Sequence, residues 1–497
     1  MAFVVGFDIG TTSTIGILIE LPSRVVAVVK RSVTLSTPHA AWAEEDPAQW
    51  WSNLCEISRE LIARSGVGPG QIKAVGVAGM LPAVVLLDAE GQLLRPSIQQ
   101  SDGRAGQEVI DLKAEADEVA FIAKAGNGIN QQLVGAKLRW LERHEPEVFS
   151  RIHTVLGSYD YINFKLTGER SIDRNWALEA GFVNVQTHEL DDDLINFAHI
   201  GRCNLPPMHR SEEIVGHISK QASAETGLAV GTPVVAGAAD HIASAYAAGV
   251  TRPGDILFKF GGAVDVLVST DIVAPDSRMY LDYHLVPGLY MPNGCMSTGG
   301  SGLNWFAANF ASSLASSDDH DGLLKTLDRL AGSVAPGSDG LIFLPYFLGE
   351  KTPIHDPALR GTLTGLSFTH GVGHVWRALL EGYGYAIAHH VEVFTEMGHS
   401  VTNCYVSDGG SSSDVWMQMV SDILQRPLQR LSGHPGSCLG AAWIAAIGAG
   451  LEDDWGKVSS FITKSKSFEP NQANAGIYSR GYNKFRDLGR RMSGFVA

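Results

Sequence analysis

The sequence predicts an α/β protein built from two related halves, each of which opens with a β-hairpin. At the N-terminus, apolar runs at residues 3–5 and 15–19 flank a polar turn that contains a glycine. Residues 256–260 and 264–269 form a second such pair, joined by Gly261-Gly262-Ala263. Apolar, β-branched runs around a short glycine turn are typical of hairpins, and their recurrence indicates an internal duplication. A chain of 497 residues also exceeds one ordinary core, so we expect two large domains, with a boundary between residues 250 and 251.

The first half continues with strands and helices in alternation. Residues 25–32 predict a third strand. Asp46-Pro47 predicts the start of a helix, because it places a capping residue before a proline at the first helical position. Residues 72–77 predict a strand that runs into the loop Ala78-Gly79-Met80-Leu81-Pro82, where a ligand could bind. The pattern weakens between residues 173 and 204, which we interpret as an insert.

The second half repeats this alternation. Residues 297–306 are a glycine-rich lead into a helix, and a long helix with one apolar face begins near residue 373. Residues 401–407 predict a strand that enters a Gly-Gly-Ser-rich loop, and residues 415–424 predict the helix that follows. Glycines between a strand and a helix start let a nucleotide approach the backbone and the positive end of the helix. An ordinary turn with Asp414 as the helix cap is the alternative.

Composition and charge narrow the classes of partner. The chain is 45% hydrophobic and 18% charged, which is typical of a globular protein, and its formal net charge is −15. An acidic surface gains no counterion release from nucleic acid or an anionic membrane, so we expect neither partner. The five cysteines lie far apart without a C-x-x-C pair, which favours buried, inert thiols over zinc sites or disulfides. The first strand follows the N-terminus without a signal sequence, and we expect a soluble cytoplasmic protein.

The first hairpin turn has the side chains of a phosphate site. We expect Asp8 at the tip of this hairpin, followed by Gly10, Thr11 and Thr12. Backbone N–H groups and hydroxyls can face phosphate oxygens, while a carboxylate can face Mg²⁺ through water. An ordinary hairpin with a polar turn is the alternative.

A second acidic residue follows a strand end in the first half. Residues 234–236 predict a short strand, and Gly237-Ala238-Ala239 leads from it to Asp240 and a small-residue helix. Asp240 can be a plain helix N-cap, or its carboxylate can face a ligand. Residues 95–104 add amides, a carboxylate and a guanidinium in one loop, which suits a hydroxyl-rich substrate or simply a solvated loop.

One arrangement therefore recurs at four strand ends spread over both halves: a strand is followed by a glycine turn and then by an acidic or hydroxyl residue. Two duplicated α/β halves with a phosphate hairpin at each start describe an actin-like, ribonuclease H-like architecture that closes on ATP. Such a cleft suits phosphoryl transfer, which needs positioning, a metal ion on the phosphates and a base for the acceptor hydroxyl.

Five stretches in this order carry a specific resemblance. The chain resembles the FGGY family of carbohydrate kinases over nearly its whole length, and it is most similar to the xylulokinase branch. The matching stretches are FDIGTT at residues 7–12, VAGAADH at 235–241, GGSGLNW at 299–305, GTLTGL at 361–366 and DGGSSSDVWMQ at 408–418.

The resemblance implies roles for the matching residues. Asp240 corresponds to the catalytic base that takes the proton from the sugar hydroxyl, and Asp8 to the residue associated with Mg²⁺. The domain of residues 1–250 is then the sugar-binding and catalytic one, and residues 251–497 bind the nucleotide. The residues implied to bind ATP are Thr11, Thr12, Gly261, Gly262, Gly300, Asn304, Gly409, Gly410 and Asp414.

The sugar-binding segments depart from the xylulokinase pattern. Xylulokinases have Q-M-H-G where this chain has Met80-Leu81-Pro82-Ala83, and W-N-D-x-R where it keeps only Asp102 and Arg104. The resemblance implies a ketopentose as substrate, D-xylulose or a related ketose. A pocket that hydrogen-bonds a hydroxyl rejects analogues lacking it far more strongly than an apolar pocket does, so the departures favour a ketose or polyol other than D-xylulose, with fewer hydroxyls at one end. The residues expected to bind it are Gly79, Met80, Leu81, Pro82, Asp102, Arg104 and Asp240. The segment from Lys137 to Trp140 also matches the K-x-x-W spacing of the family, with a surface lysine and a core tryptophan as the alternative.

Other functions stay open at this point. The alternatives are a kinase for ribulose, a deoxyketose, erythritol or glycerol, a non-catalytic actin-like ATP-binding or sugar-sensing protein, and a phosphatase of the same superfamily. Retention of Asp8 and Asp240 argues against the non-catalytic alternative. The family leads us to expect ATP and Mg²⁺ as cofactors and a homodimer, and the break at residues 251–254 is a candidate hinge.

Overall fold

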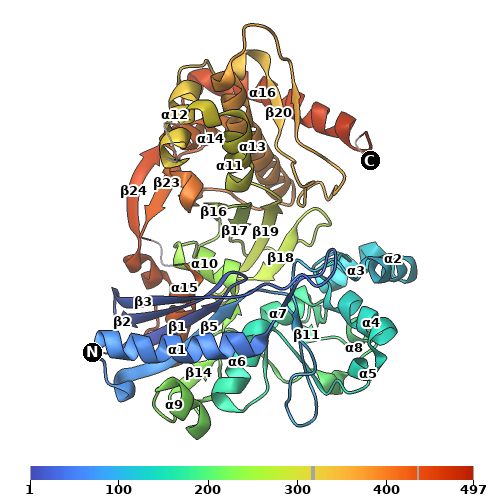
Figure 1. Cartoon of the computed structure of the whole chain (residues 1–497), viewed down its shortest axis with the longest axis vertical. Coiled ribbons are helices and arrows are strands. Elements are labelled where there is room, and N and C mark those ends of the chain that lie inside the picture. Colours follow the sequence, from blue (N-terminus) through green and yellow to red (C-terminus); the bar gives the residue numbers. More distant parts are fainter. Residues whose placement is uncertain (1, 315–319, 434–435, 496–497) are drawn as a thin grey trace. The chain divides into compact units, whose positions relative to one another are not determined.

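A computed structural model describes residues 2–314, 320–433 and 436–495. It divides into two compact units, and each draws on separate parts of the sequence (Figure 1). Unit 1 contains residues 1–251, 273–291 and 433–462, and unit 2 contains residues 252–272, 292–432 and 463–497. The break predicted at residues 251–254 coincides with a boundary between the units, but two later segments fold with the first half. The division of sugar and nucleotide binding between two domains remains a prediction.

The main sheet of unit 1 has the strand order β13-β14-β5-β1-β2-β3, and β15 also pairs with β5. Strand β2 is antiparallel to both of its neighbours, β1 and β3. On the other side of β1, β5 is parallel to β1, β14 is parallel to β5, and β13 is antiparallel to β14. This confirms the predicted N-terminal hairpin and third strand. The strands are β1 (Phe3–Ile9), β2 (Ser13–Glu20), β3 (Arg24–Ser32), β5 (Ile72–Gly79), β13 (Ile214–His217), β14 (Pro233–Val235) and β15 (Ala238–Ala239).

The sheet of unit 2 repeats this pattern. Within unit 2, six strands of this seven-stranded sheet follow the order β19-β17-β16-β22-β23-β24, with two antiparallel pairs, then two parallel pairs, then one antiparallel pair. The strands are β16 (Asp255–Phe260), β17 (Val264–Val268), β19 (Tyr290–Met296), β22 (Asn403–Ser407), β23 (Leu428–Ser432) and β24 (Thr463–Phe468). Two sheets with one order and one sequence of orientations confirm the predicted duplication.

Helices cover both faces of the first sheet (Figure 1). Helix α15 (Ser437–Gly448) contacts β1 and β5, and a Cβ added at Gly76 would lie 2.1 Å from the backbone oxygen of Ala441. Helix α1 (Pro47–Ser65) contacts β2 and β3, and Asp46 caps it by accepting from the N–H of Ala48 at 2.9 Å, as predicted. Backbone therefore meets backbone between α15 and the sheet, and only glycine at position 76 permits this approach.

The remaining helices and strands complete the two units. In unit 1 they are β4 (Glu44–Glu45), β6 (Val85–Leu87), β7 (Ser97–Ile98), α2 (Gly106–Glu115), α3 (Glu118–Ala125), α4 (Val134–His144), α5 (Pro146–Phe149), β8 (Thr154–Leu156), α6 (Ser158–Thr167), β9 (Ile172–Asp173), α7 (Arg174–Glu179), β10 (Val183–Asn184), β11 (Glu189–Leu190), α8 (Asp192–Asn196), β12 (Met208–His209), α9 (Lys220–Thr226), α10 (Asp240–Ala247) and β18 (Tyr280–Tyr283). In unit 2 they are α11 (Gly300–Phe310), α12 (His320–Gly332), β20 (Ile342–Leu344), β21 (Thr362–Thr364), α13 (Val372–Glu396), α14 (Asp414–Leu424) and α16 (Ala475–Met492). Residues 173–204, interpreted as an insert, contain α7, β10, β11 and α8.

Two expectations from composition can be checked directly. Cys55, Cys404 and Cys438 are buried, but Cys203 is exposed and Cys295 is half-buried, so the prediction of five buried thiols was wrong for these two. Among the described residues, no helix has the length and apolar character needed to cross a membrane.

Candidate active site

Three strand ends of unit 1 bring the predicted acidic residues together. Asp8 is not at the tip of the hairpin: it lies within β1, paired with Ile15 on one side and Ala78 on the other. Strand β15 also pairs with β5, so that Ala239 lies opposite Gly79, and Asp240 follows directly. Because β1, β5 and β15 run parallel, their carboxyl ends lie at one edge of the sheet. Asp8, Gly79 and Asp240 therefore gather at that edge.

The hairpin turn also contacts the predicted sugar loop. The Thr11 hydroxyl donates to the Met80 sulfur at 3.6 Å, and the Met80 N–H donates to the Ile9 carbonyl at 3.1 Å. On the other side, the Ser158 hydroxyl donates to the Met80 carbonyl at 2.7 Å. Met80 is thus held from both sides, and the predicted phosphate turn and sugar loop are neighbours in unit 1.

Lys137 is a buried anchor of the sugar loop. Its ammonium donates to the carbonyls of Pro82, at 3.3 Å, and Gln99, at 2.9 Å. The side chain is fully buried, and this burial lowers its pKa to about 7. The alternative of a surface lysine was therefore wrong. Lys137 ties the loop that contains Leu81 and Pro82, both buried, to the segment that leads to Asp102.

Asp102 and Arg104 form a buried ion pair. The Arg104 Nε and Nη2 donate to the two oxygens of Asp102, both at 2.8 Å, and the Arg104 guanidinium carbon lies 3.8 Å from the ring centroid of Trp42 and 4.9 Å from that of Trp140. Burial disfavours the charged carboxylate, but hydrogen bonds from Arg104 and from the backbone of Ala43 outweigh it and lower the pKa of Asp102. These groups mainly bind each other, and the Nη1 of Arg104 has no hydrogen-bond partner among the described residues.

Asp240 is the first residue of α10, and its carboxylate is accessible. Ala239, not Asp240, occupies the N-cap position, so the interpretation of Asp240 as a plain cap was wrong. The side chain is 38% exposed, and its Oδ1 accepts from the backbone N–H of His241 at 2.6 Å. The imidazole of His241 lies between two carboxylates, with Nδ1 3.3 Å from Asp240 Oδ1 and Nε2 2.9 Å from Asp282 Oδ2.

Three glycine loops meet in unit 2. The N–H groups of Gly299 and Ser301 donate to the Gly262 carbonyl, and that of Gly300 donates to the Gly261 carbonyl. A Cβ added at Gly410 would lie 3.2 Å from the backbone oxygen of Phe260. The predicted nucleotide glycines of both loops, 261–262 and 409–410, therefore lie together with the start of α11.

A cavity of about 280 Å³ adjoins these loops in unit 2. Its lining combines the bare backbone of Gly409 and Gly410 with the apolar side chains of Leu303, Trp376 and Trp416, and it also includes the charged Asp321, Lys325 and Asp328. A pocket of this kind can receive a flat apolar ring such as a nucleobase.

Two further predicted nucleotide residues form side-chain contacts. The Asn304 oxygen lies 3.1 Å from His320 Nε2. Asp414 forms ion pairs with Arg430 at 2.7 Å and Lys466 at 2.6 Å. Asp414 is not the cap of α14, because the Ser413 hydroxyl accepts from the N–H of Trp416.

Comparison with known proteins agrees with this arrangement. Two family models match the chain: the N-terminal domain of the FGGY family of carbohydrate kinases at residues 3–247 and its C-terminal domain at residues 266–449. The chain belongs to the FGGY family of carbohydrate kinases. It is an ATP-dependent sugar kinase with the duplicated actin-like architecture of that family.

Individual relatives in this family cover the full chain. The chain is 30% identical to a xylulose kinase from Escherichia coli over 99% of its own length and 100% of that protein. It is 27% identical to a gluconokinase from Bacillus subtilis, over 98% and 97%. The crystal structure of a xylulose kinase from Rhodospirillum rubrum superposes with a TM-score of 0.94 at 52% identity, over 99% of both chains.

Two residues of this kinase that contact the Asp240 region were missed by sequence reasoning. Asp282, in β18, accepts from His241, and Glu179, the last residue of α7, lies beside both. Glu179 falls in the segment interpreted as an insert, and Asp282 is 41 residues from His241. No local pattern marks either residue, because their contact with His241 depends on the tertiary fold.

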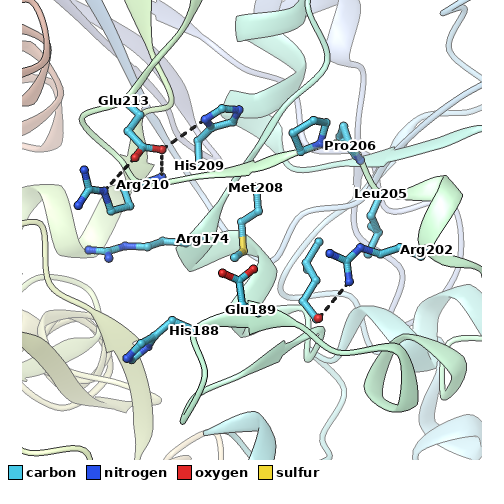
Figure 2. A pocket seen from close by; sticks show the side chains of 12 residues that line it. Arg174, His188, Glu189, Arg202, Leu205, Pro206, Met208, His209, Arg210 and Glu213 are labelled. Atoms are coloured by element: carbon cyan, nitrogen blue, oxygen red, sulfur yellow. Dashed lines mark hydrogen bonds and ion pairs between the residues drawn. The ribbon is translucent and has the colours of Figure 1, made fainter.

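The kinase has a further pocket of about 620 Å³ in unit 1 (Figure 2). Glu213 bonds Arg210 and lies 3.3 Å from His209, and Arg202 donates to the Leu190 carbonyl (Figure 2). Arg174, the first residue of α7, also lines it, at the other end of that helix from Glu179. None of the residues predicted from the sequence lines this pocket.

Proposed function

We propose that this kinase phosphorylates a ketopentose, with D-xylulose as the first candidate, and uses Asp240 as the general base. The single observation that carries the base assignment is the position of Asp240 at the sheet edge. It is a half-exposed carboxylate directly after the residue that pairs with Gly79 of the sugar loop. The choice of D-xylulose follows the xylulose kinases among the most similar proteins.

Asp240 would accept the proton of the attacking hydroxyl as the new bond to the γ-phosphorus forms. General bases of this kind typically contribute about 10²- to 10⁴-fold to the rate. The hydrogen bond from the His241 N–H holds Oδ1 in place, which limits the rotation of the carboxylate. A base that is already oriented loses little conformational entropy when the substrate binds.

The ATP phosphates would be held by N–H groups and hydroxyls. Thr11 and Thr12 lie in the first turn, and Gly261 and Gly262 in the second. Asp8 fits a magnesium site in its donor chemistry, since it places a half-buried carboxylate beside the hydroxyl-rich turn. Bound Mg²⁺ would neutralise phosphate charge. The adenine would occupy the cavity of unit 2 next to Gly409 and Gly410.

The base assignment is tested with Asp240→Asn. We expect this variant to bind ATP as the wild type does and to lose sugar phosphorylation by about 10²- to 10⁴-fold. Asp453→Asn, at an exposed position, is the matched control and should keep wild-type turnover. Turnover by Asp240→Asn near the wild-type level would remove Asp240 from the role of base.

The substrate is tested with a coupled ADP-release assay and Mg·ATP. The panel contains D-xylulose, ribulose, a deoxyketose, ketohexoses, erythritol, glycerol and gluconate. Dominance of D-xylulose would support the proposal despite the apolar Leu81 and Pro82. Dominance of another compound would contradict it and would make these two positions the first to examine for specificity. Phosphate release without any sugar would instead favour transfer to water.

A further inference from the structure

Asp240 lies at the end of a chain of ionisable side chains that comes from three separate elements. We propose that His241, Asp282 and Glu179 form a positioning chain that sets the orientation and charge of Asp240. This inference rests on the proposed role of Asp240 as the general base, and it assigns roles to residues from α7 and β18 that no sequence motif marks.

The chain is continuous from Asp240 to Glu179. His241 reaches Asp240 twice, through its backbone N–H at 2.6 Å and through Nδ1 at 3.3 Å, both on Oδ1. Its Nε2 lies 2.9 Å from Asp282 Oδ2. Glu179 in turn hydrogen-bonds Asp282, and Glu179, His241 and Asp282 each place one polar atom within 4.8 Å of the others.

Hydrogen bonds to the backbone on both sides of Asp282 hold this residue in place. Its neighbour Leu281 exchanges two hydrogen bonds with the side chain of Asn127, at 2.9 Å each. Its other neighbour, Tyr283, exchanges two with the side chain of Asn175, at 2.7 and 3.0 Å. Both asparagines and the Asp282 side chain are buried. Asp282 is therefore fixed between two clamped residues, which is how a preorganised site holds a charged group.

The proton positions follow from burial and from neighbouring charges. Burial disfavours a charged imidazole, but hydrogen bonds with Asp240 and Asp282, and their negative charges, raise the pKa of His241 well above its usual range. Burial, and then the charge of Asp282, raises the pKa of Glu179 well above its usual range. The positive charges of His241 and of Lys137, in α4, oppose this shift and lower the pKa of Glu179. With these shifts, we expect Glu179 to keep its proton and His241 to be protonated at neutral pH.

This arrangement gives each group a role. Neutral Glu179 donates to Asp282, the Asp282 carboxylate stabilises the imidazolium, and the imidazolium donates to Asp240 and favours its ionised form. When Asp240 accepts the sugar proton, that proton stays on Asp240 and none moves along the chain. His241, Asp282 and Glu179 therefore act as positioning residues and not as a relay.

The same three side chains could instead bind a divalent cation, since imidazole and two carboxylates are common metal ligands. We favour the positioning chain because the 2.9 Å hydrogen bond between His241 Nε2 and Asp282 Oδ2 already uses one atom of each of these two side chains. The cation is accordingly one of the outcomes of the test.

The test measures kcat, KM and the pH profile of kcat for His241→Asn and Asp282→Asn. Both should lower kcat by up to about 10²-fold and leave the KM for ATP within twofold. Both should also shift the acidic limb of the kcat profile to higher pH by about 1 unit, because the cation beside Asp240 is lost. The matched control is His199→Asn, since His199 pairs with Glu142 at 2.6 Å on the surface and should keep the wild-type profile.

Glu179 provides a rescue test. Glu179→Leu removes the donor to Asp282 and should lower kcat, whereas Glu179→Gln keeps a donor and should recover most of the loss. For wild-type protein with ¹⁵N-labelled histidine, we expect a doubly protonated His241 ring at pH 7.5 by NMR, assigned by its absence in His241→Asn. Circular dichroism and ATP binding verify that each variant folds.

The outcomes separate this inference from the proposed function. If Asp240→Asn is inactive but the His241 and Asp282 variants keep the wild-type profile, only the positioning chain is refuted. If Asp240→Asn retains turnover, Asp240 is not the general base, and the positioning chain is refuted as well. A neutral His241 ring, or activity that is lost in both Glu179 variants and depends on added Mn²⁺ or Zn²⁺ after chelation, would overturn the chain in favour of a cation site.

Discussion

The buried pair of Asp102 and Arg104 allows a quantitative prediction for Arg104→Met. The guanidinium makes two hydrogen bonds of 2.8 Å to Asp102 and one of 2.7 Å to Glu44, and the side chains of both Arg104 and Asp102 are 0% exposed. Methionine would fill similar space against the rings of Trp42 and Trp140 but would leave the carboxylate of Asp102 without its cation. Breaking a buried ion pair from one side costs about 3–5 kcal/mol.

We expect the lower end of that range, about 3 kcal/mol, because Asp102 would keep two backbone donors. These are the N–H of Ala43 at 2.6 Å and that of residue 104 at 3.0 Å. For a unit of about 300 residues, each kcal/mol lowers Tm by about 2 °C, so the calorimetric transition of unit 1 should fall by about 6 °C.

Two comparisons make the Arg104 prediction falsifiable. Arg31→Met removes an arginine that pairs at the surface with Glu56, at 2.9 Å, and with Glu60, and it should cost no more than about 1 kcal/mol. Asp102→Asn combined with Arg104→Met removes the uncompensated charge and should be more stable than Arg104→Met alone. The reasoning fails if Arg104→Met is as stable as Arg31→Met, or if the double variant is the less stable one.

Two further predictions concern packing and pH. Gly76→Ala places a Cβ 2.1 Å from the Ala441 carbonyl and should destabilise unit 1 by about 1–3 kcal/mol, whereas Gly70→Ala, with nothing within 4 Å, should change little; equal thermal stability of the two variants would contradict this. Burial raises the pKa of Glu350 to about 8, even though the N–H groups of Ser297 and Lys351 donate to it at 2.8 Å. Since the folded protein keeps this proton while the unfolded chain loses it above about pH 4.5, stability is fully present below that pH and falls by up to about 1.4 kcal/mol per unit as pH rises to 8. Glu350→Gln should make this decline shallower in urea unfolding between pH 5 and 8, and parallel curves for the two proteins would refute the assignment.

Features with a local pattern could be predicted from the amino-acid sequence alone. The spacing of neighbouring residues predicts the two hairpins, the cap at Asp46 and the glycine loops after strands. The structure contains all of them. The duplication was visible for the same reason, since each half repeats the hairpin. The position of Asp240 after a strand end was also predictable, because β15 and its loop are continuous in the chain.

Contacts between side chains that are far apart in the sequence could not be predicted, because they depend on how the elements pack. Lys137 was as compatible with the surface as with the core until α4 placed it against the Pro82 and Gln99 carbonyls. Asp282 and Glu179 reach His241 because β18 and α7 pack together through Asn175. Likewise, residues 433–462 join unit 1 because the backbone of α15 fits against Gly76. Contacts of this kind depend on strand register and helix packing over tens of residues, and short-range periodicity carries no information about them.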